Sequence, residues 1–379
     1  MLEEILKKKE YLPILKMNDG SEVTLENFKE RRKEMIELLE KYSYGRTPEQ
    51  PSKLWGEVVL KQENTYCGKA YCEKIEISFE TSYGLFKLPF ELYVPYRVVN
   101  PSVFLHIAFR PAPDRFIPVE EIIDGGYALA VVTIPDMVND NGNCDFSDGL
   151  GKYFGLDKGR KGDDPGKVSL WAYGASRVMD YLVKYKDDID TKSVAVIGHS
   201  RLGKTALWCG AQDERISAVI SNNSGYGGAC SSKDSHGEKI EDFIRIKSWE
   251  LFCENFLLFK DKENEKPYDQ AFLLALVAPR LLLVGSASRD IGAYPEGEFL
   301  TTLYASKVWE LFGKKGLICP DRLPEVGDNF VEGDVNYHLR DDLHFLSRED
   351  WQVYMGYLDL KFGKKERTDY HLPIVNRYK

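Results

Sequence analysis

The chain has 379 residues, of which 43% are hydrophobic, so it can bury a large core in one big domain or in two to three ordinary ones. Its 51 basic and 60 acidic residues leave a net charge of −9, and nucleic acid is therefore not an expected partner. No apolar run approaches the roughly 20 residues of a membrane span, so a membrane is not an expected partner either.

The first part of the chain predicts helix and then strands. Residues 24–43 carry apolar side chains at helical spacing. Residues 56–62, 69–80 and 84–95 alternate apolar and polar side chains, which is typical of β-strands, with a hairpin turn before the last of them. We interpret residues 1–50 as a helical extension packed on the main domain.

From residue 102 onward, short continuous apolar runs alternate with helical segments. The predicted strands are residues 102–109, 127–134, 193–198, 218–221 and 280–288. The predicted helices lie near residues 166–185, from 202 onward, and near 268–276, 297–312 and 349–361. Apolar strands separated by helices indicate a mostly parallel central sheet with helices on both faces. We therefore expect residues 51–379 to form one α/β domain.

The turn between one apolar strand and the next helix carries a candidate nucleophile. Residues 198–203 read GHSRLG, the strand–turn–helix context of the nucleophile elbow in α/β-hydrolases. Such a turn exposes the Ser200 hydroxyl at the carboxyl end of the sheet and points the Arg201 N–H at a developing oxyanion. The match to GxSxG is imperfect, because Leu202 stands where the second glycine is usual. The alternative is a plain turn with a serine N-cap.

A serine nucleophile needs a base and an orienting acid, which in α/β-hydrolases follow the serine as acid and then histidine. Asp290 follows the predicted strand 280–288 and is the expected acid. Three histidines come later, and His371 lies in a polar tail. We favour His344, in the expected loop beside the last helix, as the base, with His338 as the alternative.

The segment GHSRLGK (198–204) resembles the signature of the glucuronoyl esterase family, in which arginine follows the serine directly. Further segments are similar to this family in the same order: ENFKERRKEMIELLEKYSYGRTP (26–48), DPGKVSLWAYGASRVMDYL (164–182), SNNSGYGG (221–228), HGEKIEDF (236–243), APRLLLVGSASRD (278–290), PEGEF (295–299) and YHLRDDLHFLSREDW (337–351). A resemblance over most of the chain implies the α/β-hydrolase fold with a serine triad.

The resemblance also implies roles for the catalytic residues. Ser200 is the nucleophile, His344 is the base, and the Arg201 guanidinium stabilises the oxyanion. Some family members place a glutamate acid where this chain has Asn223, which cannot carry the charge. Asp290 is therefore the implied acid, in agreement with the order of the residues.

The sequence does not identify the residue that supplies the second backbone N–H to the oxyanion. It usually comes from the loop after the third strand of the fold, here residues 109–112. Pro111 in this loop has no N–H. Another residue must supply the donor, or the Arg201 side chain carries more of the stabilisation.

For the sugar, the resemblance implies that Lys204 and Glu238 hydrogen-bond hydroxyl groups. Family members commonly place a tryptophan two residues beyond the acid, where it stacks on the uronate ring, but this chain has Gly292 there. Tyr294 stands where the family has a carboxylate, and we count it among the substrate-binding candidates. Two further aromatic residues could line the site or equally belong to the core: Trp249 and Tyr226.

These observations predict a serine carboxylic-ester hydrolase that acts on a carbohydrate ester through an acyl-enzyme, similar to a glucuronoyl methylesterase. Because Gly292 offers no ring face, an acetyl (xylan) esterase on the same fold is the alternative. A second alternative is a non-catalytic carbohydrate-binding protein that shares the fold.

We predict no metal and no cofactor. The neighbours Asp234, His236 and Glu238 lack the spacing of HExxH. An acidic, asparagine-rich loop lacks the DxDxDG pattern of calcium sites, and we expect a plain loop or an active-site rim from its polar residues: Asp136, Asp140, Asn141, Asn143 and Asp145. Seven scattered cysteines without CxxC, and no signal-peptide pattern, predict a cytoplasmic protein with free thiols.

Overall fold

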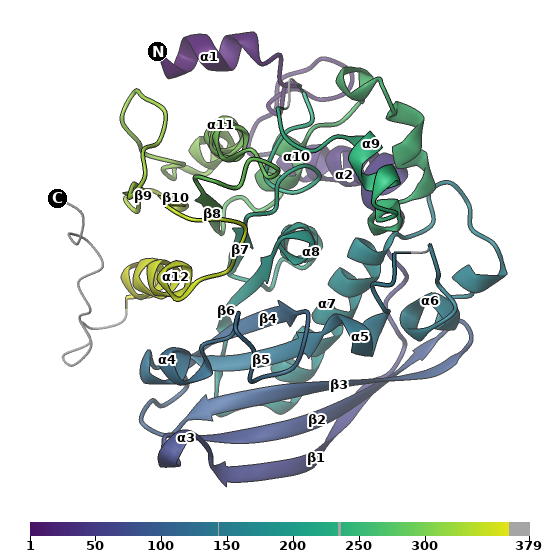
Figure 1. Ribbon diagram of the computed structural model, residues 1–379, viewed down its shortest axis with the longest axis vertical. Helices are drawn as coiled ribbons and strands as arrows, with labels where there is room; N and C mark the ends of the chain where they lie inside the picture. Colours follow the sequence, from purple (N-terminus) through teal and green to yellow (C-terminus); the bar gives the residue numbers. More distant parts are fainter. Residues whose placement is uncertain (143, 234–235, 364–379) are drawn as a thin grey trace.

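The computed structural model describes residues 1–142, 144–233 and 236–363. Within these residues ten strands form one sheet in the order β1-β2-β3-β5-β4-β6-β7-β8-β10-β9 (Figure 1). The strands are β1 (Leu54–Asn64), β2 (Ala70–Thr81), β3 (Gly84–Pro95), β4 (Ser102–Ala108), β5 (Ala128–Thr133), β6 (Asp190–His199), β7 (Ala218–Asn222), β8 (Leu281–Ala287), β9 (Asn329–Phe330) and β10 (Val335–Arg340).

Two helices precede the first strand, and the others lie between and after the strands along the chain. They are α1 (Leu2–Lys8), α2 (Phe28–Leu39), α3 (Thr65–Gly68), α4 (Val119–Asp124), α5 (Ile134–Met137), α6 (Gly149–Tyr153), α7 (Lys167–Tyr185), α8 (Arg201–Gln212), α9 (Ile240–Arg245), α10 (Gln270–Ala275), α11 (Pro295–Ala305) and α12 (Arg348–Lys361). Short 3₁₀ turns lie between them, among them Trp249–Leu251.

The centre of the sheet is parallel and its edges are antiparallel. Strands β5, β4, β6, β7, β8 and β10 pair in parallel, whereas β1, β2 and β3 form an antiparallel meander that joins β5 antiparallel. The parallel strands are buried on both faces, as their continuous apolar runs require. With helices on both faces, this arrangement is the α/β-hydrolase fold that the sequence predicts.

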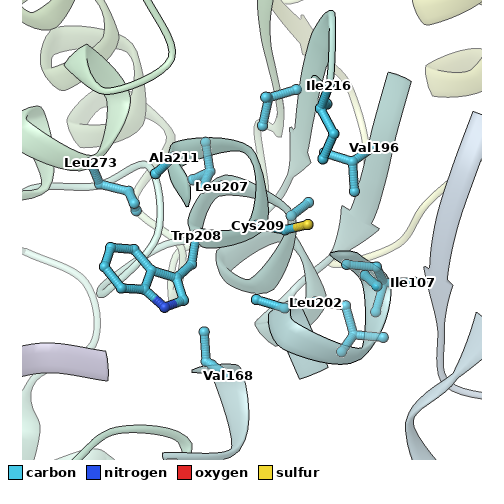
Figure 2. Packing of buried hydrophobic residues seen from close by; sticks show 14 of the residues in the cluster. Ile107, Val168, Val196, Leu202, Leu207, Trp208, Cys209, Ala211, Ile216 and Leu273 are labelled. Atoms are coloured by element: carbon cyan, nitrogen blue, oxygen red, sulfur yellow. The ribbon is translucent and has the colours of Figure 1, made fainter. Parts of the chain in front are cut away.

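Two clusters of buried hydrophobic side chains lie on opposite faces of the sheet. On β4, Phe104 packs into the cluster under α4 and α12, and the next residue, Leu105, packs into the cluster under α7 and α8. Figure 1 shows α4 and α12 on one side of the sheet and α7 and α8 on the other. Figure 2 shows part of the second cluster around α8: Leu202 lies near Ile107, and Trp208 lies on the other side of the helix, toward Val168.

Residues 1–50 share this second core. Met35 of α2 is fully buried in the same cluster as the residues of α7 and α8. Arg32 donates to the backbone carbonyl of Ala211 at 2.9 Å. Tyr11 stacks on Tyr304 of α11, with ring centroids 4.6 Å apart. The segment therefore lies along the helices that cover one face of the sheet.

Strand β10 is not among the strands that the sequence predicts. Its sequence, VNYHLR, has buried polar residues at alternate positions, so it carries no continuous apolar signal. These side chains have partners: Asn336 donates to the Phe330 carbonyl at 2.9 Å, and both His338 and Arg340 bond Asp350. The sequence analysis missed this strand because buried polar pairs replace apolar packing in it.

Candidate active site

Ser200 occupies the turn between β6 and α8. Its backbone has φ 60° and ψ −128°, a strained conformation for a residue with a side chain. Its N–H donates to the Asn222 carbonyl at 2.9 Å. A Cβ added to Gly198 would lie 2.0 Å from the Leu202 carbonyl oxygen, so only glycine fits there. The sharp turn lifts the serine out of the sheet at the carboxyl end of β6.

The imperfect glycine spacing has a structural explanation. Leu202 is fully buried and belongs to the core cluster on the α8 side of the sheet. Gly203 faces the chain beyond β7, where an added Cβ would lie 3.0 Å from Ser224 Cβ and 3.2 Å from the Asn222 carbonyl. The second small residue is therefore needed one position later, where α8 approaches the end of β7.

Ser200, His344 and Asp290 form one hydrogen-bonded array. His344 Nε2 lies 2.8 Å from Ser200 Oγ, and His344 Nδ1 lies 2.6 Å from Asp290 Oδ2. Asp290 follows β8 and His344 follows β10, so all three stand at the carboxyl edge of the parallel strands. Burial raises the pKa of the Asp290 carboxyl, but the bonds from His344 and Asn223 outweigh it and leave that pKa below its usual range. Asp290 is thus held as a carboxylate against the imidazole.

Two residues that the sequence analysis did not place in a supporting role fix this array. Asn223, which follows β7, donates from Nδ2 to Asp290 Oδ2 at 2.8 Å. The ring of His199 packs on the ring of His344, with centroids 4.6 Å apart. Burial lowers the pKa of His199 to about 3, so this neighbour is neutral and does not oppose a charged His344 by its own charge. The position of His199 directly before the serine was the only available signal.

His338, the alternative base, is not part of the array. It lies within β10 with 2% of its side chain exposed, and its Nε2 lies 2.8 Å from Asp350 Oδ1. Its partner is the enclosed Asp350 carboxylate of α12, whereas Ser200 is bonded by His344. His371 lies outside the described residues.

A cation stands beside the serine. Arg201 is the first residue of α8 and lines the cleft in front of Ser200. Its Nη1 lies 2.6 Å from Asp140 Oδ2, in a pair whose side chains are 30% and 17% exposed. The acidic loop before α6 therefore reaches the site through Asp140, a contact with no sequence signal beyond the loop's composition.

The cleft in front of the array has a volume of about 220 Å³. Its lining includes two sugar-site candidates, Lys204 and Glu238, and a wall formed by Phe243, Ile246, Ser248 and Leu251. Lys204 Nζ donates to the Ser224 carbonyl. Burial lowers the pKa of Lys204, and the Glu238 carboxylate opposes that effect. Ser248 Oγ and Asn223 Oδ1, both buried in the cleft wall, have no hydrogen-bond partner among the described residues.

A model of the family described as "Glucuronyl esterase, fungi" matches residues 120–313. Carbohydrate esterase MZ0003, from an unknown prokaryotic organism, is 33% identical to this chain, and the match covers 91% of this chain and 88% of that protein. The chain belongs to the glucuronoyl esterase family. A solved glucuronoyl esterase from Solibacter usitatus is 33% identical, with a TM-score of 0.81 over 93% of this chain and 98% of that one. The 4-O-methyl-glucuronoyl methylesterase of Podospora anserina is 26% identical over 67% of this chain and 50% of that protein.

Within this glucuronoyl esterase fold, the aromatic candidates lie beside the cleft. Ser248 and Leu251 line it, whereas Trp249 between them packs against the hydrophobic core. The Tyr294 hydroxyl accepts from Lys9 Nζ at 3.3 Å, and its ring lies at right angles to that of His236. The structure therefore joins Trp249 and Tyr294 to neighbouring segments rather than to the cleft lining.

Gly292 borders open space. An added Cβ would find nothing nearer than Asp290 Oδ1 at 3.9 Å and Glu238 Cγ at 4.0 Å. Gly292 itself lines the cleft, and its carbonyl accepts from the Glu238 N–H at 3.1 Å. This chain therefore leaves room beside Glu238, at the position where the sequence resemblance implies a tryptophan.

The other polar clusters form no metal site in the part of the chain that the structure describes, where no group of three or more His, Cys, Asp or Glu side chains could hold an ion. Asn143 and Asp234, members of the two loops that the sequence singled out, lie outside the described residues. Over the described residues, no helix combines the length and apolar character that crossing a membrane needs. All seven cysteines are free thiols.

Proposed function

We propose that the protein is a serine carboxylic-ester hydrolase that cleaves a uronate ester of a carbohydrate. One observation carries the proposal: Ser200, His344 and Asp290 are linked at 2.8 and 2.6 Å at the edge of a cleft that Lys204 and Glu238 also line. Membership of a family whose named relatives are glucuronoyl esterases supports the same substrate class.

The geometry supports a two-step reaction. Ser200 Oγ bonds to the ester carbonyl carbon while its proton passes to His344 Nε2, and the carbonyl electron pair moves onto oxygen. Arg201, through its backbone N–H and guanidinium, stabilises that oxyanion. The pair then reforms the carbonyl, the C–O bond to the alcohol breaks, and His344 returns the proton to the alcohol. Water, activated by His344, releases the uronic acid from Ser200 by the same steps.

Lys204 and Glu238 suit the sugar part of this substrate. An ammonium group donates and a carboxylate accepts, so the two together can bond neighbouring hydroxyl groups. Ser248 Oγ and Asn223 Oδ1 offer two further partners in the cleft wall, because neither is bonded within the described residues. These groups favour a polyhydroxylated ligand over an alkyl ester.

The test compares the purified protein with a Ser200→Ala variant on methyl D-glucuronate. We expect hydrolysis by the wild type and none above background by the variant. Ser288→Ala is the matched control, since this serine lies near the same edge but bonds Asp341 at 3.0 Å instead. If no ester is hydrolysed and a serine-reactive phosphonate leaves Ser200 unlabelled, the non-catalytic carbohydrate-binding reading replaces the esterase.

A second candidate, an acetyl xylan esterase, is favoured by the open space at Gly292. An acetyl group needs no ring platform, and the site offers none at that position. Activity on acetylated xylo-oligosaccharides without activity on glucuronate esters would decide for this candidate.

We also propose that the protein acts in the cytoplasm, on soluble oligosaccharide esters. The support is that all seven cysteines are free thiols, three of them exposed or partly exposed, which suits a reducing compartment. Thiol alkylation of protein taken directly from cells should modify Cys67 without prior reduction, whereas disulfide-linked Cys67 would contradict the proposal.

A further inference from the structure

A carboxylate outside the serine array is bonded to the cation beside it. Asp140 Oδ2 lies 2.6 Å from Arg201 Nη1, and both side chains are mostly buried. The other N–H groups of this guanidinium donate to no described residue. Since Arg201 lines the cleft, one amino group is held by Asp140 and the remaining donors are left for a group in the cleft.

The segment that carries Asp140 is itself anchored. The neighbouring Asn141 accepts from Lys167 Nζ at 2.9 Å. Lys167 in turn lies 3.5 Å from Glu250, and both of these side chains are fully buried. Separating a buried pair leaves an uncompensated charge, so this anchor resists displacement. Asp140 therefore presents its carboxylate from a supported position.

Two opposing effects follow from this carboxylate. Its negative charge lies near the place where the ester oxygen becomes negative, which opposes the reaction. Its bond also immobilises the long side chain of Arg201 before charge develops, so that no reorganisation is needed during the reaction. The charge is already balanced by Arg201 itself, whereas a displacement of about 1 Å in a catalytic group can cost about 100-fold in rate. The positioning effect is the larger one.

We propose that Asp140 is a positioning residue that holds the Arg201 guanidinium where the oxyanion forms. The inference rests on the proposed esterase function. Asp140 touches none of the reacting atoms: Ser200 forms the new bond, His344 takes the proton, and the oxygen that receives the electron pair meets Arg201. The effect of Asp140 must therefore pass through Arg201.

A double-mutant cycle tests this dependence on methyl D-glucuronate. We expect Asp140→Ala to lower kcat about 10- to 100-fold with little change in KM, because the bond matters when the oxyanion forms. Asp140→Asn should lose less, since its amide oxygen still accepts. In an Arg201→Gln background, Asp140→Ala should have no further effect. The rate at which a phosphonate labels Ser200 should fall in parallel with kcat, because the phosphonyl oxygen of the adduct occupies the position of the oxyanion.

Asp157→Ala is the matched control. Asp157 is an exposed carboxylate on the 3₁₀ turn Leu156–Lys158, outside the segment that carries Asp140, so its loss should leave kcat unchanged. An unchanged or increased kcat in Asp140→Ala would overturn the inference, and so would an equal loss in both Arg201 backgrounds. An active wild type that is insensitive to Asp140 rejects this inference alone, whereas a wild type that hydrolyses no ester rejects the proposed function and the inference together.

Discussion

Two histidine–aspartate pairs lie close together in this chain but in opposite surroundings. His344 Nδ1 lies 2.6 Å from Asp290 Oδ2, with 45% of the histidine side chain exposed. His338 Nε2 lies 2.8 Å from Asp350 Oδ1, with both side chains enclosed, and Arg340 shares that carboxylate at 2.8 Å. The chemistry of each pair is the same, so the surroundings decide what it can do.

The difference arises from where each histidine stands relative to β10. His338 lies inside the strand, so its ring meets α12, whose capping box contains Asp350 and Ser347. His344 lies beyond the strand end, in the loop where parallel strands of this fold place functional groups. One pair fastens a helix to the sheet, and the other leaves a ring nitrogen for Ser200.

The largest expected effect separates the two histidines. His344→Gln should lower ester hydrolysis by about 10⁴-fold or more, because the residue that takes the serine proton is lost. His338→Gln should keep most of the activity and lower the melting temperature, since an enclosed bond to Asp350 is weakened. Measuring kcat and thermal unfolding of both variants checks this, and a matching loss of activity in both would break the comparison.

The aspartates should separate in the same way. Asp350→Ala leaves Arg340 and His338 enclosed without their carboxylate and removes the Asp350 half of the capping box, so we expect a loss of about 3–5 kcal/mol in the free energy of unfolding. Asp290→Ala should abolish most activity while costing far less stability. Urea unfolding followed by circular dichroism measures both, and a less stable Asp290→Ala than Asp350→Ala would contradict the assignment.

The enclosed pair of His338 and Asp350 should make the free energy of unfolding depend on pH. Burial raises the pKa of Asp350, but its bonds with His338 and the charge of Arg340 outweigh burial and leave that pKa below its usual range. A carboxylate with a depressed folded pKa contributes stability above its unfolded pKa of about 4 and loses it as the pH falls through the folded value. The gap in unfolding free energy between wild type and Asp350→Asn should therefore narrow below about pH 4. A difference that widens below about pH 4 would contradict a depressed pKa of Asp350 in the folded protein.

Site residues that directly follow apolar strands could be predicted from the sequence. Contacts between polar residues far apart in the chain could not. Ser200 and Asp290 follow strands with strong apolar signals, so their meeting at one edge could be predicted. Strand β10 could not, because its alternate residues are polar and are satisfied by a helix that follows later. The contact between Asp140 and Arg201 could not either, since it joins residues 61 positions apart through a loop without periodicity.

The smallest expected effects come from filling the space beside each pair, at Gly285 near His338 and at Gly292 near Asp290. A Cβ on Gly285 would lie 2.3 Å from a His338 ring carbon, whereas one on Gly292 would lie 3.9 Å from Asp290. Gly285→Ala should therefore cost about 1–3 kcal/mol in stability, while Gly292→Ala should stay within about 0.5 kcal/mol of the wild type.

Gly292→Trp uses that space. A ring beside Glu238 would stack on a sugar, so KM for methyl D-glucuronate should fall about two- to tenfold with kcat little changed. For acetylated xylo-oligosaccharides the same ring gains no uronate to stack on, and KM should stay the same or rise. If KM for the glucuronate ester instead rises, the open space already holds part of the natural substrate, and the cleft is shaped for a larger group than a single uronate ring.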